Sequence, residues 1–257
     1  MKRSHRLLLF AVGAAGMAFV YCAGALNMPP WGQYRGPYGD VIAQLAVYQR
    51  HATDTVNAVT YDYRGFDTLG EEFILFSAVT GVMLLLRPEP DRSEEKGGGG
   101  SGNPASFPDR ATLSETVQVF TTAIFGFSVL FGIYMATHGQ LTPGGGFQGG
   151  VILAAAPMLL YIAENTEAFQ RIVSHPLVEF FEGVGAAGYA LIGIAALAMG
   201  AAFLTNVIPL GKTGDVFSSG TIAAISACVG VEVAAGFTLI IFEYLREILS
   251  RSKADEE

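Results

Sequence analysis

The stretch Thr137-His-Gly-Gln-Leu-Thr-Pro-Gly-Gly-Gly-Phe-Gln-Gly-Gly150 lies between two long apolar runs, Val117 to Ala136 and Val151 to Ala163. Three glycines follow a proline in it, which is typical of a turn whose backbone adopts conformations that side chains disfavour. Because apolar runs flank it on both sides, we predict a turn at a membrane surface. The residues that define this Gly-rich turn are Pro143, Gly144, Gly145, Gly146, Phe147, Gly149 and Gly150.

The composition is that of a helical membrane protein rather than a soluble domain. Of the 257 residues, 51% are hydrophobic and 15% are charged, and the mean hydropathy is +0.41. The net charge of −8, without a cluster of basic residues, argues against nucleic acid as a partner. Cys22 and Cys228 lie in apolar runs, without the spacing of a zinc or iron–sulfur site. We therefore expect no metal centre, no cofactor and no catalytic residues.

The apolar runs predict an all-α integral membrane protein with six spanning helices. The first run, Leu7 to Leu26, follows Lys2, Arg3 and Arg6, so it is either a cleaved signal peptide or a retained span. We expect retention, because about 20 apolar residues suffice to cross a bilayer. The other spans are expected near Phe73–Leu86, Leu113–Thr137, Phe147–Ala163, Val184–Leu204 and Ser219–Tyr244.

The segments between the spans are polar or mixed. Helical spacing of apolar residues from Val41 to Val59 predicts one or two short surface helices, and the charged stretch from Glu164 to Glu182 predicts an amphipathic cytoplasmic segment. Residues 88–112 are rich in glycine, serine and proline, which predicts a flexible cytoplasmic linker. The linker divides a two-helix module, residues 1–87, from a four-helix domain, residues 113–257.

The distribution of lysine and arginine predicts the orientation. With the N-terminus inside, the inner segments hold eleven of these residues and the outer segments hold four, which are Arg35, Arg50, Arg64 and Lys212. Positive charge is enriched on the cytoplasmic side of membrane proteins, so we expect both termini there. The Gly-rich turn then lies on the outer face.

Acidic residues inside or beside the spans are the candidates for chemistry, because charge is costly in a membrane. Glu232 lies near the middle of the last predicted span. Its carboxyl group either carries a proton or sodium ion along a transport path or forms an interhelix hydrogen bond to a neighbouring subunit. Glu71 and Glu72 begin the second span and point about 100° apart, so they cannot both face one site. Asp67, one turn before Glu71, and His138, beside the Gly-rich turn, complete the ion or proton path candidates, with interfacial structural roles as the alternative.

Three motifs resemble a known family. The Gly-rich turn resembles the signature of the B subunit of Mrp-type (Mnh-type) multisubunit cation/proton antiporters and of related subunits in membrane-bound hydrogenases. Val229-Gly-Val-Glu-Val-Ala-Ala-Gly-Phe237 is similar to the last helix of that protein, so the resemblance covers residues 113 to 246. Asp62-Tyr-Arg-Gly-Phe-Asp-Thr-Leu-Gly-Glu71 resembles a motif near the C-terminal end of the large A subunit. In that motif Glu71 aligns with a glutamate, whereas Glu72 stands where a non-acidic residue is expected.

The resemblance implies a subunit of a complex that exchanges Na⁺, or another monovalent cation, for H⁺ across a prokaryotic cytoplasmic membrane. It implies A-, C-, D-, E-, F- and G-like subunits and lipid as partners, and a role in pH and Na⁺ homeostasis rather than an enzyme activity. No lysine lies inside a predicted span, whereas the proton-pumping subunits of such machines use buried lysines. We therefore expect a chain that completes the cation path or holds the helices that do. A sodium module of a redox-driven complex, such as a membrane-bound hydrogenase, and a purely structural scaffold are the alternatives.

Overall fold

The computed structural model describes residues 3–28, 32, 36–86, 115–163, 169 and 173–254. Within these ranges the chain forms helices and turns and no β-strand, which confirms the predicted all-α class. The chain divides into two compact units, Met1–Asp40 and Val41–Glu257. The predicted linker, residues 88–112, lies outside the described residues.

The first unit contains one long helix. Helix α1 (Arg3–Leu26) has 24 residues, and its apolar part is Phe10–Leu26. A helix therefore forms where the first apolar run of the sequence predicts one. Helix α2 (Pro37–Arg50) begins in the first unit and continues into the second.

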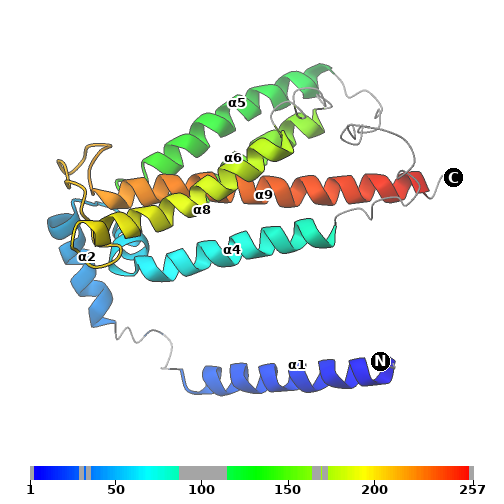
Figure 1. The fold of residues 1–257 in the computed structure, drawn as a ribbon, viewed down its shortest axis with the longest axis horizontal. Helices are drawn as coiled ribbons and strands as arrows, with labels where there is room; N and C mark the ends of the chain where they lie inside the picture. The colour runs from blue at the N-terminus through cyan, green and yellow to red at the C-terminus, as the bar shows by residue number, and fades with distance from the viewer. Residues whose placement is uncertain are drawn as a thin grey trace. The chain divides into compact units, whose positions relative to one another are not determined.

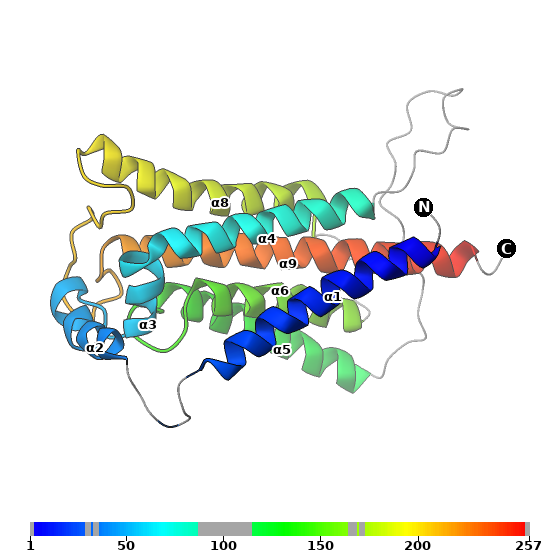
Figure 2. The same cartoon turned by 90° about the horizontal axis from the view of Figure 1, so that it is seen from below.

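The second unit is a bundle built around α9 (Thr221–Ala254). Helices α6 (Gly146–Ile162) and α8 (His175–Ala198) pack against α9, α4 (Gly65–Leu85) contacts both α8 and α9, and α5 (Glu115–Thr137) packs mainly on α6. Figure 2 shows α4 and α8 on one side of α9 and α5 and α6 on the other (compare Figure 1). In the apolar part of α9, 61% of the residues are buried, against 22% in α4, 17% in α5 and 33% in α8. The last helix is thus the centre of the bundle.

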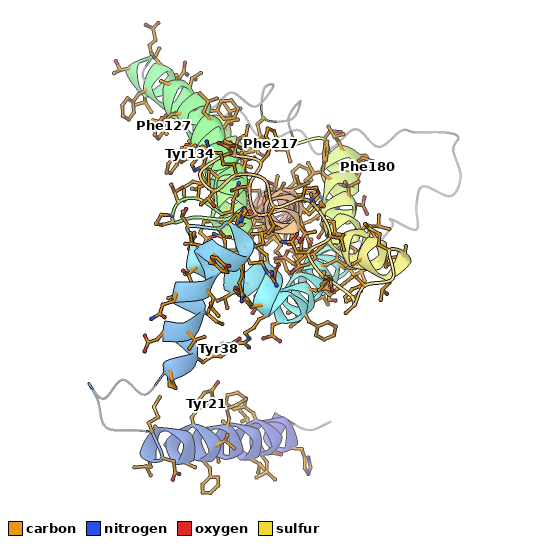
Figure 3. The ribbon with its side chains drawn as sticks, turned by 90° about the vertical axis from the view of Figure 1, so that its left-hand side faces the viewer. Tyr21, Tyr38, Phe127, Tyr134, Phe180 and Phe217 are labelled. Atoms are coloured by element: carbon orange, nitrogen blue, oxygen red, sulfur yellow. The ribbon has the colours of Figure 1, made fainter. Side chains whose placement is uncertain are left out.

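Four of the described helices, α4, α5, α8 and α9, are long and apolar enough to cross a membrane, and α6 is a shorter apolar helix. Their outer faces carry large apolar side chains. Phe127 and Tyr134 on α5 and Phe180 on α8 point away from the bundle (Figure 3) and are 66%, 45% and 63% exposed. Such faces suit contact with lipid or with other apolar helices rather than with water.

Three predicted spans differ from the observed helices by more than five residues at one end or both. One is the last span, because α9 continues to Ala254, ten residues beyond the predicted end at Tyr244. Helix α4 begins at Gly65, six residues before Glu71, where the second span is predicted to begin, because a helix N-terminus favours acidic residues such as Asp67 in its first turn. Helix α8 begins at His175 and ends at Ala198, earlier than the predicted Val184–Leu204. Residues 175–182 thus belong to a helix that is long and apolar enough to cross a membrane, where the sequence predicts a separate amphipathic segment. Gly200, with φ of +77°, lies just beyond the end of α8, where the left-handed conformation stops a helix.

Irregular segments close one end of the bundle, which we call the loop end. They are α3 (Thr55–Ala58), the π-helical turn η1 (Val59–Tyr63), the Gly-rich turn and the connection 199–220. Hydrogen bonds join them: Asp54 N–H donates to the Gln140 carbonyl (3.1 Å), and the Ser219 hydroxyl donates to the His51 carbonyl (3.0 Å). The short helices predicted between residues 41 and 59 are therefore present, as α2 and α3. We call the opposite end of the bundle the far end.

Candidate functional site

Glu232 lies at the centre of the bundle, on the buried face of α9. Its side chain is 0% exposed, and neither carboxylate oxygen has a hydrogen-bond partner among the described residues. Helix α8 approaches closely here, because a Cβ built on Gly185 would lie 2.6 Å from the Cβ of Glu232. A buried acid without a partner is costly and therefore points to a role other than packing.

Glu72 on α4 faces Glu232. It is 4% exposed, and its carboxyl group lies close enough to that of Glu232 to interact directly. The contact is a close approach rather than a well-formed hydrogen bond, since one oxygen of Glu72 and both of Glu232 have no partner of good geometry in the described part of the chain. Glu71, the neighbouring residue, is exposed. The structure therefore places Glu72, and not Glu71, beside Glu232.

Glu182 on α8 is a third buried acid, which the sequence analysis did not single out. It is 3% exposed, its Oε1 lacks a hydrogen-bond partner among the described residues, and it interacts electrostatically with Glu232. The same oxygen lies 3.6 Å from the position of a Cβ on Gly236, one turn beyond Glu232 in α9. A helix-start signal was present, because Ser174 is the N-cap and a proline occupies the first turn of α8. Counting two turns from that start places Glu182 inside the helix.

A cavity of about 960 Å³ continues from Glu182 towards the far end. The cavity is lined by α4, α8 and α9, and Glu243 of α9, at 3% exposed, is a further buried acid in its wall and lies nearest the far end. One oxygen of Glu243 contacts both His175 Nε2 (3.2 Å) and Arg246 Nη1 (3.3 Å). Acidic groups thus continue from the middle of the bundle to this end.

Tyr61, in the loop-end turn η1, lies near Glu72 of the Glu72–Glu232 pair. It is 4% exposed and contacts Ser226 and the first backbone N–H groups of α6. Burial, and then the negative charge of Glu72, raise the pKa of Tyr61 to about 12, so the hydroxyl keeps its proton at neutral pH. A second hydroxyl, that of Tyr189, donates to the carbonyl of Gly65 (2.7 Å) and holds α8 to the start of α4.

The Gly-rich turn is held by a side chain from the first half of the sequence. The Asn57 amide, 2% exposed, donates to the carbonyl oxygens of Gly139 (2.6 Å) and Gly144 (2.8 Å) and to the Asp54 carboxylate (2.7 Å). Gly145 requires glycine, because its φ is +143° and a Cβ there would lie 2.7 Å from Asn57 Oδ1. Asn57 therefore connects α3 to the turn between α5 and α6.

The remaining residues of the turn pack the helices or lie at the surface. A Cβ on Gly146, Gly149 or Gly150 would clash with Ser226, Ala136 or Val233 respectively, so these glycines allow α5, α6 and α9 to touch. Pro143 is exposed. Phe147 is 47% exposed and packs edge-on against Phe237 of α9.

Two other candidates lie outside the acidic cluster. Asp67 is exposed and forms an ion pair with Arg64, one turn away. His138 is half-buried at the loop end, with Nδ1 3.1 Å from the Thr142 hydroxyl and its ring stacked on Tyr134. The structure thus brings together Glu72, Glu232 and, in addition, Glu182. No group of three His, Cys, Asp or Glu side chains in the described ranges has the geometry of a metal site.

A bundle of apolar helices with unpaired acids at its centre defines a multi-pass membrane protein of the transport class. Residues 116–239 match a family described as a domain related to the MnhB subunit of Na⁺/H⁺ antiporter. An uncharacterised protein of Methanocaldococcus jannaschii is 31% identical over 199 residues, which are 73% of this chain and 75% of that protein. The chain belongs to this MnhB-related family, which confirms the resemblance seen in the Gly-rich turn.

Other relatives carry antiporter names. The B subunit of a Na⁺/H⁺ antiporter of Bacillus subtilis is 29% identical over 111 residues, 41% of this chain and 77% of that protein. The A/B subunit of a probable K⁺/H⁺ antiporter of Rhizobium meliloti is 30% identical over 189 residues, which are 68% of this chain but only 18% of that protein. The chain thus resembles a protein whose name joins the A and B subunits.

Two solved complexes contain a chain of similar fold. One is the membrane-bound sulfane sulfur reductase, an archaeal respiratory membrane complex, with 30% identity, a TM-score of 0.66 and coverage of 93% of this chain and 98% of that chain. The other is the Mrp complex from a Dietzia species, with 23% identity and a TM-score of 0.67 over 95% of this chain and 26% of that chain. At 23% identity, the similarity to the Mrp chain shows that the two chains share a fold and shows nothing about a shared role.

Proposed function

We propose that the chain is a subunit of a multisubunit cation/proton antiporter in a prokaryotic cytoplasmic membrane, and that its buried acids form part of the ion or proton path. The observation that carries the proposal is the pair Glu72 and Glu232, two enclosed carboxyl groups on different helices that face one another. Membership of the MnhB-related family supports it.

The pair suits the transfer of one positive charge. Two carboxylates this close in apolar surroundings repel strongly, so the pair is most stable when one proton or one cation balances it. Arrival of a proton then favours release of a cation, and the reverse, which is the coupling that exchange requires. Among the described residues no lysine or arginine forms an ion pair with either acid. A mobile proton or cation must therefore balance the negative charge of the Glu72–Glu232 pair.

The topology that we propose has six spans with both termini in the cytoplasm. It is supported by the alternating directions of α4, α5, α6, α8 and α9, which gather the irregular segments at the loop end. Helix α6, with 17 residues, rises about 26 Å, close to the thickness of the hydrocarbon core. Arg50, Arg64 and Lys212 lie in loop-end segments, and the charge pattern of the sequence assigns the larger share of lysine and arginine to the inner segments. The loop end and its Gly-rich turn are then the outer face.

The partners are the A-, C-, D-, E-, F- and G-like subunits of the antiporter. The exposed aromatic side chains of α5 and α8 are consistent with burial against such subunits or against lipid. No lysine lies in α4, α5, α6 or α8, or in the part of α9 that could cross a membrane, Thr221–Ile248. The chain therefore depends on a partner for a basic group that would move protons through the membrane.

The test is Na⁺-induced collapse of a pH gradient in everted vesicles that contain the whole complex. Glu232→Gln keeps the shape of the side chain and removes its charge, and Glu71→Gln is the matched control at an exposed position. We expect exchange to be lost with Glu232→Gln and kept with Glu71→Gln, while a native gel shows intact complexes of both. Normal exchange by the Glu232→Gln complex would remove the basis of the proposal.

A second candidate function is the ion-translocating module of a redox-driven respiratory complex. The observation that favours it is the share of each similar chain that this protein covers. This share is 98% for the chain of the sulfane sulfur reductase complex and 26% for the chain of the Mrp complex. The two functions differ in driving force. If Na⁺ moves only when an electron donor is supplied, the second candidate is right, and exchange driven by ion gradients alone supports the antiporter.

A further inference from the structure

The far-end cavity holds polar groups that the Glu72–Glu232 pair does not use. On one wall lie Phe76, Thr80, Met83 and Leu84 of α4, which are mostly apolar. On the other walls lie Glu179 and Glu182 of α8 and Glu243 of α9. Its volume of about 960 Å³ has room for a few tens of water molecules at about 30 Å³ each. A hydrated ion therefore fits without any movement of the helices.

Two buried oxygen atoms in this cavity lack a partner. Glu182 Oε1 and Glu243 Oε2 make no hydrogen bond among the described residues, and both side chains are only 3% exposed. The two acids line the same cavity from different helices. Because an unpaired buried carboxylate oxygen is costly, a ligand that supplies positive charge is expected in the cavity that they line.

The charge of the cavity is negative. Glu179, Glu182 and Glu243 line it, and Arg246 is the fixed positive charge among the described lining residues, so the net charge is −2 when the three carboxyl groups are ionised and His175 is neutral. Arg246 and His175 both contact Oε1 of Glu243 and leave Oε2 free. Since no described group has the geometry of a tightly ligated metal ion, two carboxylates and water suit a hydrated monovalent cation better than a divalent one.

We propose that Glu182 and Glu243 form a loading site for a monovalent cation in the far-end cavity, separate from the Glu72–Glu232 pair. This inference rests on the proposed function and assigns a different step of transport to each of the two acidic sites. The cation binds first at the Glu182–Glu243 site. A change in the charge of the Glu72–Glu232 pair then favours movement of the cation along the path. Glu182, which also interacts with Glu232, connects the two.

Arg246 has a specific part in this site. Its guanidinium contacts Glu243 Oε1 at 3.3 Å, and the Arg246 side chain is partly exposed, at 28%. A cation that binds to Glu243 therefore competes with the attraction of a positive charge that is always present. Replacement of Arg246 by glutamine should strengthen cation binding, because the competing charge is removed and the carboxylate stays.

The experiment measures protection rather than transport. Everted vesicles with the whole complex are treated with dicyclohexylcarbodiimide, which modifies carboxyl groups in apolar surroundings, and the label on Glu182 is quantified by peptide mass spectrometry. NaCl is compared with choline chloride at equal ionic strength. We expect Na⁺ to lower the labelling of Glu182 several-fold, Glu243→Gln to abolish this protection, and Arg246→Gln to lower the half-protecting Na⁺ concentration several-fold. Glu71→Gln is the control and keeps normal protection.

The outcomes separate this inference from the proposed function. Equal labelling in Na⁺ and choline by the unmodified complex, or full protection in an assembled Glu243→Gln complex, would overturn the loading site and leave the Glu72–Glu232 pair untouched. If Na⁺ protects Glu182 but exchange survives Glu232→Gln, the site binds the cation and it is the proposed path through the central pair that fails.

Discussion

Glu72 of α4 and Glu232 of α9 face each other inside the bundle, although 160 positions of sequence separate them. Helices α4 and α9 bring them together, and α8 encloses Glu232 through the close approach of Gly185. Tyr61 of the loop-end turn η1 interacts with Glu72, and Glu182, which lines the far-end cavity, interacts with Glu232.

Glu72→Gln is expected to slow Na⁺-dependent proton exchange by about tenfold or more, which corresponds to about 1.4 kcal/mol or more in the barrier. The physical reason is loss of one of two charges that hold the mobile ion. Glu71→Gln makes the same chemical change at the neighbouring, exposed position. The complex that carries it should exchange Na⁺ for protons at the normal rate. The rates are measured in everted vesicles at matched complex levels. A larger loss with Glu71→Gln than with Glu72→Gln would show that the inward-facing acid is not the working one.

Gly185→Ala is expected to destabilise the packing of α8 on α9. The added Cβ would lie 2.6 Å from the Cβ of Glu232 and 2.8 Å from the carbonyl oxygen of Cys228. Overpacking of this kind costs about 1–3 kcal/mol. Gly183→Ala is the matched control, since no described atom lies within 4 Å of a Cβ at that position. Thermal midpoints of the detergent-solubilised complex, followed by size-exclusion chromatography, should fall for Gly185→Ala alone.

Asn57→Ala is expected to loosen the Gly-rich turn. It removes the donor to the carbonyls of Gly139 and Gly144, and buried acceptors left without a donor cost about 1–3 kcal/mol. Limited proteolysis should then cut the turn faster, and the thermal midpoint should fall. Asn27→Ala, which removes an exposed bond to the Ala23 carbonyl at 2.8 Å, serves as the comparison. Equal protease sensitivity of the two variants would show that Asn57 does not hold the turn.

Tyr189→Phe is expected to affect transport more than assembly. The lost hydrogen bond to the Gly65 carbonyl, 2.7 Å long, contributes about 1 kcal/mol, too little to dissociate the complex. It orients the start of α4, however, and so the direction in which Glu72 points. We expect exchange to fall several-fold with an intact complex on a native gel. Tyr48→Phe, at a position that is 83% exposed, should leave exchange unchanged, and the same value for both variants would argue against this role.

Much of the helix pattern could be predicted from the sequence, because spanning helices need long apolar runs. The observed α5 and α6 lie within two residues of the predicted spans. The predicted start of α8 lies too far along the sequence, because Glu179 and Glu182 lower the apolar character of its first turns. Ser174 and the proline that follows in the first turn mark the observed start. The sequence also placed Glu71 and Glu72 about 100° apart on a helix. It could not decide which one faces inward, because the rotation of α4 is set by contacts such as Tyr189 to Gly65, which are 124 positions apart.

The measurement that tests the central claim most directly is a double-mutant cycle on the exchange rate with Glu72→Gln, Glu232→Gln and the double variant, all in assembled complexes. If the two acids share one mobile charge, removal of either one abolishes that shared site, and the double variant should exchange about as slowly as the slower single variant. If the two acids act independently, the losses will multiply. A double variant far slower than both single variants would contradict the pair as the working unit of this protein.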